Sequence, residues 1–76
     1  MTRRGRGPAR DELVNHLLEH RQEAGLTQAA LAEAIGVTRK TVNTVERGHY
    51  VPSTVLALRL AAALDTTVES LFELAE

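Results

Sequence analysis

The sequence predicts an all-α domain of five helices, and three observations lead to this expectation. With 76 residues, the chain can build one small hydrophobic core but not two. Its apolar residues recur at helical spacing in several short stretches. Aromatic residues make up only 3 % of the chain while alanine and leucine are abundant, a composition that favours helices over sheets. We expect residues 1–10 to be a disordered basic arm and residues 11–76 to be a single domain.

The first two helices are predicted from apolar stripes that end at glycines. From Asp11 to Ala24 apolar side chains recur every three or four residues, and Gly25 follows as a stop. Thr27 is suited to cap a second helix, whose shorter stripe ends at Gly36. These two helices are therefore expected to be joined by a tight connection.

Each of the remaining three helices follows a residue whose hydroxyl can cap its first turn. Thr38 precedes a third helix that Gly48 ends, and Ser53 precedes a fourth, strongly apolar helix. Thr67 precedes a predicted fifth helix over Val68–Leu74. All the connections are short, as in a compact helical domain.

Basic charge is confined to two parts of the chain, although the net charge is only −1. Residues 1–10 carry +4 and residues 25–50 carry +1, whereas residues 11–24 and 51–76 each carry −3. This distribution predicts that a local surface, and not the whole domain, meets a polyanion.

Composition also excludes several classes of protein. The absence of cysteine removes disulfides and thiolate metal sites and suits a reducing compartment. No apolar stretch approaches the roughly 20 residues that span a bilayer, and the basic N-terminus lacks the apolar region of a secretory signal. We therefore expect a cytoplasmic, nucleoid-associated protein without a membrane segment.

The stretch from Gln28 to Arg47 is the most informative part of the sequence. It holds two short helices and a turn, with the small Ala32 where the helices would cross and Gly36 in the turn. If the valines of the third helix face the core, its outward residues carry hydrogen-bonding side chains without a carboxylate: Arg39, Lys40, Asn43, Thr44 and Arg47. Such a surface suits the base edges and phosphates of DNA.

This pattern resembles the lambda-repressor-like helix-turn-helix domain of the xenobiotic response element (XRE) type, as found in small stand-alone bacterial and phage regulators. The matching segments are Arg21–Gln28, Leu31–Ala32, Ile35–Arg39, Thr41–Gly48, Tyr50–Ser53 and Leu71–Phe72. The resemblance implies that the third helix, residues 38–47, enters the major groove of double-stranded DNA while the second crosses the backbone. It also implies a transcriptional repressor that binds a pseudo-palindromic operator as a homodimer, without enzymatic activity, cofactor or metal.

The resemblance assigns roles to individual side chains. Gln28 would bind a phosphate and brace the third helix, Arg39 would read a base edge, and Thr44 would face the groove. Lys40 could bind base or phosphate, Asn43 suits adenine or phosphate, and Tyr50 is expected to pack under its loop with the hydroxyl on phosphate or solvent. The full expected DNA-binding set is Thr27, Gln28, Thr38, Arg39, Lys40, Thr41, Asn43, Thr44, Arg47, His49 and Tyr50.

Two further sets of residues are expected to be structural. Arg21 and Glu46 match family positions that form a partly buried ion pair between the first and third helices. The apolar residues Val55, Ala62, Leu71, Phe72 and Leu74 would form a self-complementary dimer surface. Val55 and Ala62 depart from the family, which commonly has lysine or glutamate at these positions.

Alternative interpretations arise from three features. His16–His20 matches the H-x-x-E-H zinc motif, but a third ligand and a substrate domain are missing, so a solvated helix face is preferred. The arm around Arg6 could attract phosphates, enter a minor groove or remain an inert tail. At the level of function, an antitoxin-like regulator or a protein-interaction module would have a protein as its main partner.

Overall fold

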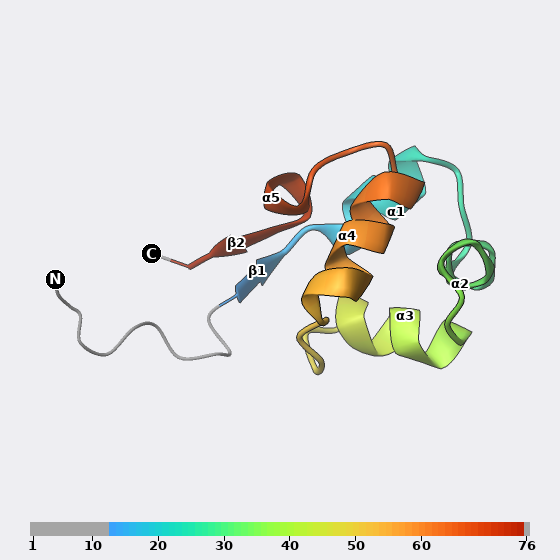
Figure 1. Cartoon of the computed structure of the whole chain (residues 1–76), viewed down its shortest axis with the longest axis horizontal. Coiled ribbons are helices and arrows are strands. Elements are labelled where there is room, and N and C mark those ends of the chain that lie inside the picture. The colour runs from blue at the N-terminus through green and yellow to red at the C-terminus, as the bar shows by residue number, and fades with distance from the viewer. Residues whose placement is uncertain (1–12, 76) are drawn as a thin grey trace, which may run out of the picture.

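The computed structural model describes residues 13–75, so the predicted arm over residues 1–10 lies outside the described residues, as do Asp11 and Glu12. In this range the chain forms five helices and one two-stranded ribbon (Figure 1). Their order is β1 (Leu13–Asn15), α1 (Leu17–Glu23), α2 (Gln28–Ile35), α3 (Arg39–Glu46), α4 (Thr54–Ala63), α5 (Val68–Leu71) and β2 (Phe72–Leu74). The predicted all-α class is confirmed, with the ribbon as a minor addition.

Side-chain caps start four of the five helices. The hydroxyl oxygen of each capping residue accepts a hydrogen bond from the backbone N–H three residues later, at 3.0–3.2 Å. These caps are Thr27, Thr38, Ser53 and Thr67. A cap of this kind satisfies one of the amide groups that an isolated helix end leaves unpaired.

The ends of the described chain form an antiparallel ribbon, which corrects the two outermost predicted helices. Leu13 pairs with Leu74 and Asn15 with Phe72, so the first helix begins only at Leu17 and the fifth ends at Leu71. The side-chain oxygen of Asn15 accepts from the Leu17 amide at 2.9 Å, at the point where the strand ends and α1 begins. Pairing between distant segments therefore overrides the local helical pattern.

The core lies where α2 packs against α3 and α4, with α1 on α3 and α5 against α4. It consists of Leu17, Leu31, Ala32, Ile35, Val42, Val45, Ala57, Leu60, Ala61, Leu64, Leu71 and Phe72. Ala32 is buried on α2 within this core, where a larger side chain would overpack the neighbouring helices. Within residues 13–75 no helix is long and apolar enough to cross a bilayer.

The turn between α2 and α3 depends on the backbone of Gly36. Its φ of 78° lies in the left-handed region, and the amides of Gly36 and Val37 donate to the carbonyls of Glu33 and Ala32. Glycine adopts this φ at little cost, so the chain can leave α2 and enter α3 within three residues. This turn fixes the position of α3.

We predict that Asp65→Gly stabilises the domain. Asp65 has a φ of 56° directly after Leu64, the C-cap of α4, so its negative charge follows the negative end of the helix dipole. Replacement by glycine relieves both the strained backbone and the unfavourable charge, and should raise the free energy of unfolding by about 0.5–1 kcal/mol. Urea denaturation would measure the change. The same substitution at the exposed Glu69 inside α5 should instead destabilise, and stabilisation by both would contradict the explanation.

Candidate nucleic-acid interface

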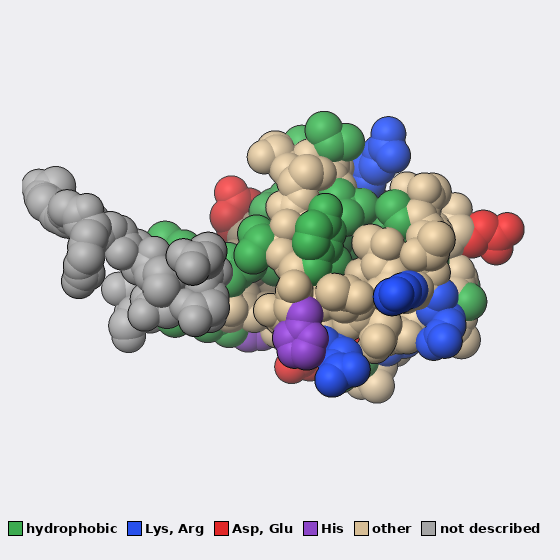
Figure 2. Space-filling view, turned by 90° about the horizontal axis from the view of Figure 1, so that it is seen from below, with side chains coloured by type: hydrophobic (Ala, Val, Ile, Leu, Met, Phe, Trp, Pro, Cys, Tyr) green, Lys and Arg blue, Asp and Glu red, His purple; other side chains and the backbone are tan. Residues whose placement is uncertain are grey.

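Helix α3 divides into a buried apolar face and an exposed polar face. Val42 and Val45 are each only 1 % exposed and hold the helix on the core. On the outer side Arg39, Lys40 and Arg47 are exposed, while Thr41, Asn43 and Thr44 are partly exposed. Figure 2 views the molecule from the α3 side and shows lysine and arginine side chains across this face, with the acidic side chains toward its edges.

The single carboxylate of α3 is neutralised inside the molecule. Glu46 accepts from Nε and Nη2 of Arg21 at 2.5 and 3.3 Å, and the side chains of Arg21 and Glu46 are 12 % and 5 % exposed. Nη1 of Arg21 also donates to the carbonyl of Leu26 at 2.8 Å. This ion pair ties α1 to the end of α3 and leaves the outer face of α3 with positive charge only.

Gln28, the first residue of α2, extends the ion pair into a network. Its amide nitrogen donates to Oε1 of Glu46 at 2.9 Å and to Oδ1 of Asn43 at 3.2 Å. Its amide oxygen accepts from Nη1 of Arg39 at 3.3 Å. Gln28 therefore braces α3 near both of its ends, and the guanidinium of Arg39 is held on the outer face before any ligand arrives.

Asn43 takes part in the same network. A bidentate contact with adenine uses both the oxygen and the nitrogen of an asparagine amide, and in this network the oxygen already accepts from Gln28. The amide nitrogen remains as a donor. The predicted contact of Asn43 with adenine or with a phosphate stays a prediction.

The threonines of the predicted site use their hydroxyls within the protein. Thr27 and Thr38 cap α2 and α3, and Thr38 also shares a hydrogen bond of 3.1 Å with the hydroxyl of Thr41. The hydroxyl of Thr44 donates to the carbonyl of Lys40 at 2.7 Å. These residues consequently shape and stiffen the helix as well as lining its outer surface.

The end of α3 and the following loop hold the last three predicted residues. Arg47 and His49 are exposed beside the C-terminus of the helix, where each can reach a polyanion. Tyr50 does not pack under its loop as predicted, because its residue is 46 % exposed and lines a recess beside Lys40 and Thr44. Its ring belongs to the outer surface.

One structural residue of this region escaped sequence reasoning. The amide nitrogen of Asn15 donates to the carbonyl of Val45, which joins the end of β1 to the last turn of α3. Asparagine side chains often hydrogen-bond to nearby backbone groups, so an asparagine close to an apolar stripe was a usable signal. Because a helix was expected from Asp11, Asn15 was placed inside that helix and no separate role was assigned to its side chain.

Comparison with known proteins decides the family. A family model described as helix-turn-helix matches residues 17–71, most of the chain. The chain belongs to the helix-turn-helix family of the XRE type. An uncharacterised helix-turn-helix transcriptional regulator of Methanothermobacter thermautotrophicus is 52 % identical over 59 residues, which cover 76 % of this chain and 86 % of that protein. The α2–turn–α3 unit is thus the helix-turn-helix of a family of DNA-binding transcriptional regulators.

Two further similarities concern proteins with more specific descriptions. The restriction-modification controller protein C.AhdI of Aeromonas hydrophila superimposes with a TM-score of 0.68 and 42 % identity, over 71 % of this chain and 78 % of that one. Antitoxin HigA-1 of Vibrio cholerae is 44 % identical over 52 residues, which cover 68 % of this chain but only 49 % of the antitoxin. The chain therefore spans about half the length of that relative.

Outside the helix-turn-helix, the structure places some of the predicted dimer residues in the core and others on the surface. Leu71 and Phe72 are 0 % and 9 % exposed, so they fill the core and the expectation that they form a surface patch is wrong. The reason is the ribbon, which turns the chain after α5 back onto β1. Val55 and Leu74 are exposed, at 59 % and 60 %.

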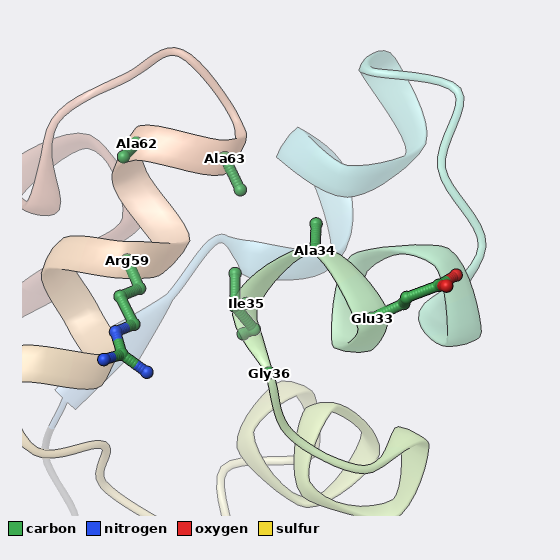
Figure 3. A pocket seen from close by; sticks show the side chains of 7 residues that line it. All are labelled: Glu33, Ala34, Ile35, Gly36, Arg59, Ala62 and Ala63. Carbon is green, nitrogen blue, oxygen red and sulfur yellow. The ribbon is translucent and has the colours of Figure 1, made fainter.

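Ala62 borders a hollow of about 570 Å³ between the end of α2 and α4 (Figure 3). In this view Arg59 extends from α4 toward the turn that contains Gly36, while Glu33 points away from the hollow. The small alanines of α4 leave the space open. Ala62 thus lines a hollow that Arg59 also lines.

The apolar groove lies elsewhere, between the loop after α3, α4, α5 and the ribbon, with a volume of about 350 Å³. Its lining is Leu13, Val51, Pro52, Thr54, Ala57, Leu58, Val68 and Phe72. Val51 and Leu58 are 54 % and 57 % exposed. Sequence reasoning did not single out either residue, because only the tertiary fold brings the loop and α4 together.

Proposed function

We propose that this protein is a sequence-specific transcriptional repressor that binds a pseudo-palindromic operator in the cytoplasm as a homodimer. The observation that carries the proposal is the outer face of α3, where Arg39, Lys40 and Arg47 are exposed while Glu46 is sequestered by Arg21. Side chains of this type bind base edges and phosphates when a helix enters the major groove. Repression would follow if the bound protein blocks access of RNA polymerase to a promoter. Its role would be binding without catalysis.

Selection of duplexes from a random library at two salt concentrations tests the proposal. An inverted repeat is expected, with half-sites about 34 Å or one helical turn apart, and affinity should fall steeply as salt rises. A promoter fused to the selected operator should then lose activity when the protein is expressed. Unselective binding would contradict sequence-specific regulation, and the absence of binding would contradict any role on DNA.

The homodimer is supported by the apolar groove beside α4. Exposed valine and leucine side chains at its rim leave apolar surface that a second copy could cover. Two copies joined by a two-fold axis would present two α3 helices to one face of DNA. The proposed interface therefore contains Val51 and Leu58.

We predict that Leu58→Glu converts the dimer to a monomer, because a carboxylate in the groove would lose water without gaining a partner. Light scattering at a concentration where the unmodified protein is dimeric would measure this. Leu18→Glu is the matched control, since Leu18 is a half-exposed leucine of α1 outside the groove and its replacement should leave the dimer intact. Equal behaviour of the two variants would rule out the groove as the interface.

A second candidate function is suggested by the similarity to antitoxin HigA-1. An antitoxin-like regulator would bind a toxin as well as DNA, and the same groove could hold that protein. Purification of the native complex from its own cells distinguishes the candidates. A second polypeptide in fixed stoichiometry favours the antitoxin-like role, whereas a complex with two copies of this chain alone favours the repressor.

A further inference from the structure

The outer face of α3 contains a recess whose chemistry differs from its surroundings. The recess has a volume of about 270 Å³ and is lined by Lys40, Thr41 and Thr44 of α3 and by Tyr50 of the following loop. It opens on the same face as the exposed arginines, so a nucleic acid that lies on α3 must cover it.

Hydrogen bonds within the protein make this recess largely apolar. The hydroxyl hydrogen of Thr44 is committed to the carbonyl of Lys40 at 2.7 Å, and the hydroxyl of Thr41 is paired with that of Thr38 at 3.1 Å. The apolar groups that these lining residues can offer to the recess are two threonine methyl groups, the methylene stem of Lys40 and the ring of Tyr50. In the major groove, the apolar group that DNA presents is the methyl group on C5 of a pyrimidine.

We propose that this recess binds the 5-methyl group of one pyrimidine in each half-site, with Thr44 and Tyr50 as the specificity-determining residues. The proposal rests on the proposed function and names what the outer face of α3 reads beside the base contacted by Arg39. The group is supplied by thymine in ordinary DNA or by 5-methylcytosine in modified DNA. Both present the same methyl group at the same place in the major groove.

Single-methyl changes in the operator test the proposal directly. Each thymine of the selected operator is replaced in turn by uracil, which deletes one methyl group, and each cytosine by 5-methylcytosine, which adds one. At one position per half-site, removal of the methyl group should weaken binding about fourfold, the contribution expected for one buried carbon. If the recess recognises modified DNA, 5-methylcytosine at one position should instead strengthen binding by a similar factor.

Variants of the recess separate methyl recognition from a structural role. In Thr44→Ser the hydroxyl and its bond to Lys40 are retained and the methyl group is lost, so the affinity ratio between methylated and unmethylated operators should fall to about one. Thr44→Val retains a methyl group and should keep the preference. Tyr50→Ala should reduce the ratio, whereas Tyr50→Phe should preserve it.

The outcomes are distinct from those that test the function itself. A protein that binds its selected operator but responds to no methyl change overturns the inference and leaves the repressor intact. Thr44→Ser that weakens binding to both forms of the operator by the same factor also overturns it, because the residue is then only structural. A protein that selects no DNA sequence overturns both the proposed function and the inference that rests on it.

Discussion

Replacement of Glu46 by alanine is expected to lower the free energy of unfolding by about 3–5 kcal/mol. The change would leave the guanidinium of Arg21, which is 12 % exposed, without the carboxylate that accepts two of its hydrogen bonds. It would also remove the acceptor that holds the amide of Gln28. For a domain of this size such a loss is comparable to the whole stability, so a large share of the protein should be unfolded.

Urea denaturation followed by circular dichroism measures this effect. Glu33→Ala is the matched control, because Glu33 is an exposed glutamate of α2 and its loss should change stability by less than about 0.5 kcal/mol. The double variant Arg21→Met with Glu46→Leu should recover much of the stability, since no buried charge is then left without its partner. A Glu46→Ala variant as stable as Glu33→Ala would show that the ion pair contributes little.

The second large effect concerns how the two exposed arginines of the α3 region bind DNA. Arg39→Ala should reduce discrimination at one base pair of the operator by about 1–3 kcal/mol, because Gln28 presents this guanidinium for a two-pronged contact with guanine. Arg47→Ala should instead weaken binding to all sequences alike and reduce the slope of log affinity against log salt by about one. We therefore expect Arg39→Ala to change discrimination between sequences and Arg47→Ala to change the overall affinity for DNA.

Competition between operator and base-substituted duplexes, repeated at several salt concentrations, measures both quantities. Arg59→Ala is the charge-matched control, because Arg59 lies on α4 beside the hollow of Figure 3 and not on α3. It should leave the discrimination at every base pair intact. If Arg39→Ala and Arg47→Ala weaken every duplex equally, neither arginine reads a base.

The helix-turn-helix was predictable because its signals are local. Thr27, Gly36 and Thr38 each act within a few residues, through a hydroxyl on a nearby amide or through a left-handed backbone angle. The faces of α3 followed from the spacing of its two valines. The roles of Gln28 and of the Arg21–Glu46 pair came from the resemblance to a known family, since no local rule pairs residues that far apart.

The ribbon and the apolar groove were not predictable because they depend on contacts between residues that are far apart in the chain. Leu13 and Val14 fit the stripe of a helix as well as a strand, and their partners lie at the other end of the domain. Leu71 and Phe72 were placed on the surface because a fifth helix to Leu74 was expected to expose its apolar face. Their burial depends on a pairing that the order of residues alone does not reveal.

The ribbon also has a consequence for the order of folding. The contacts of α2 with α3 and of α3 with its turn join residues close in the chain, whereas Leu13 meets Leu74 only after nearly the whole chain has been brought into a loop. Closing a long loop is slower and entropically costlier than forming a local contact. We therefore expect the helix-turn-helix to form early and the two ends to join last. The ribbon would then fix both ends of the domain only after α2 and α3 have packed together.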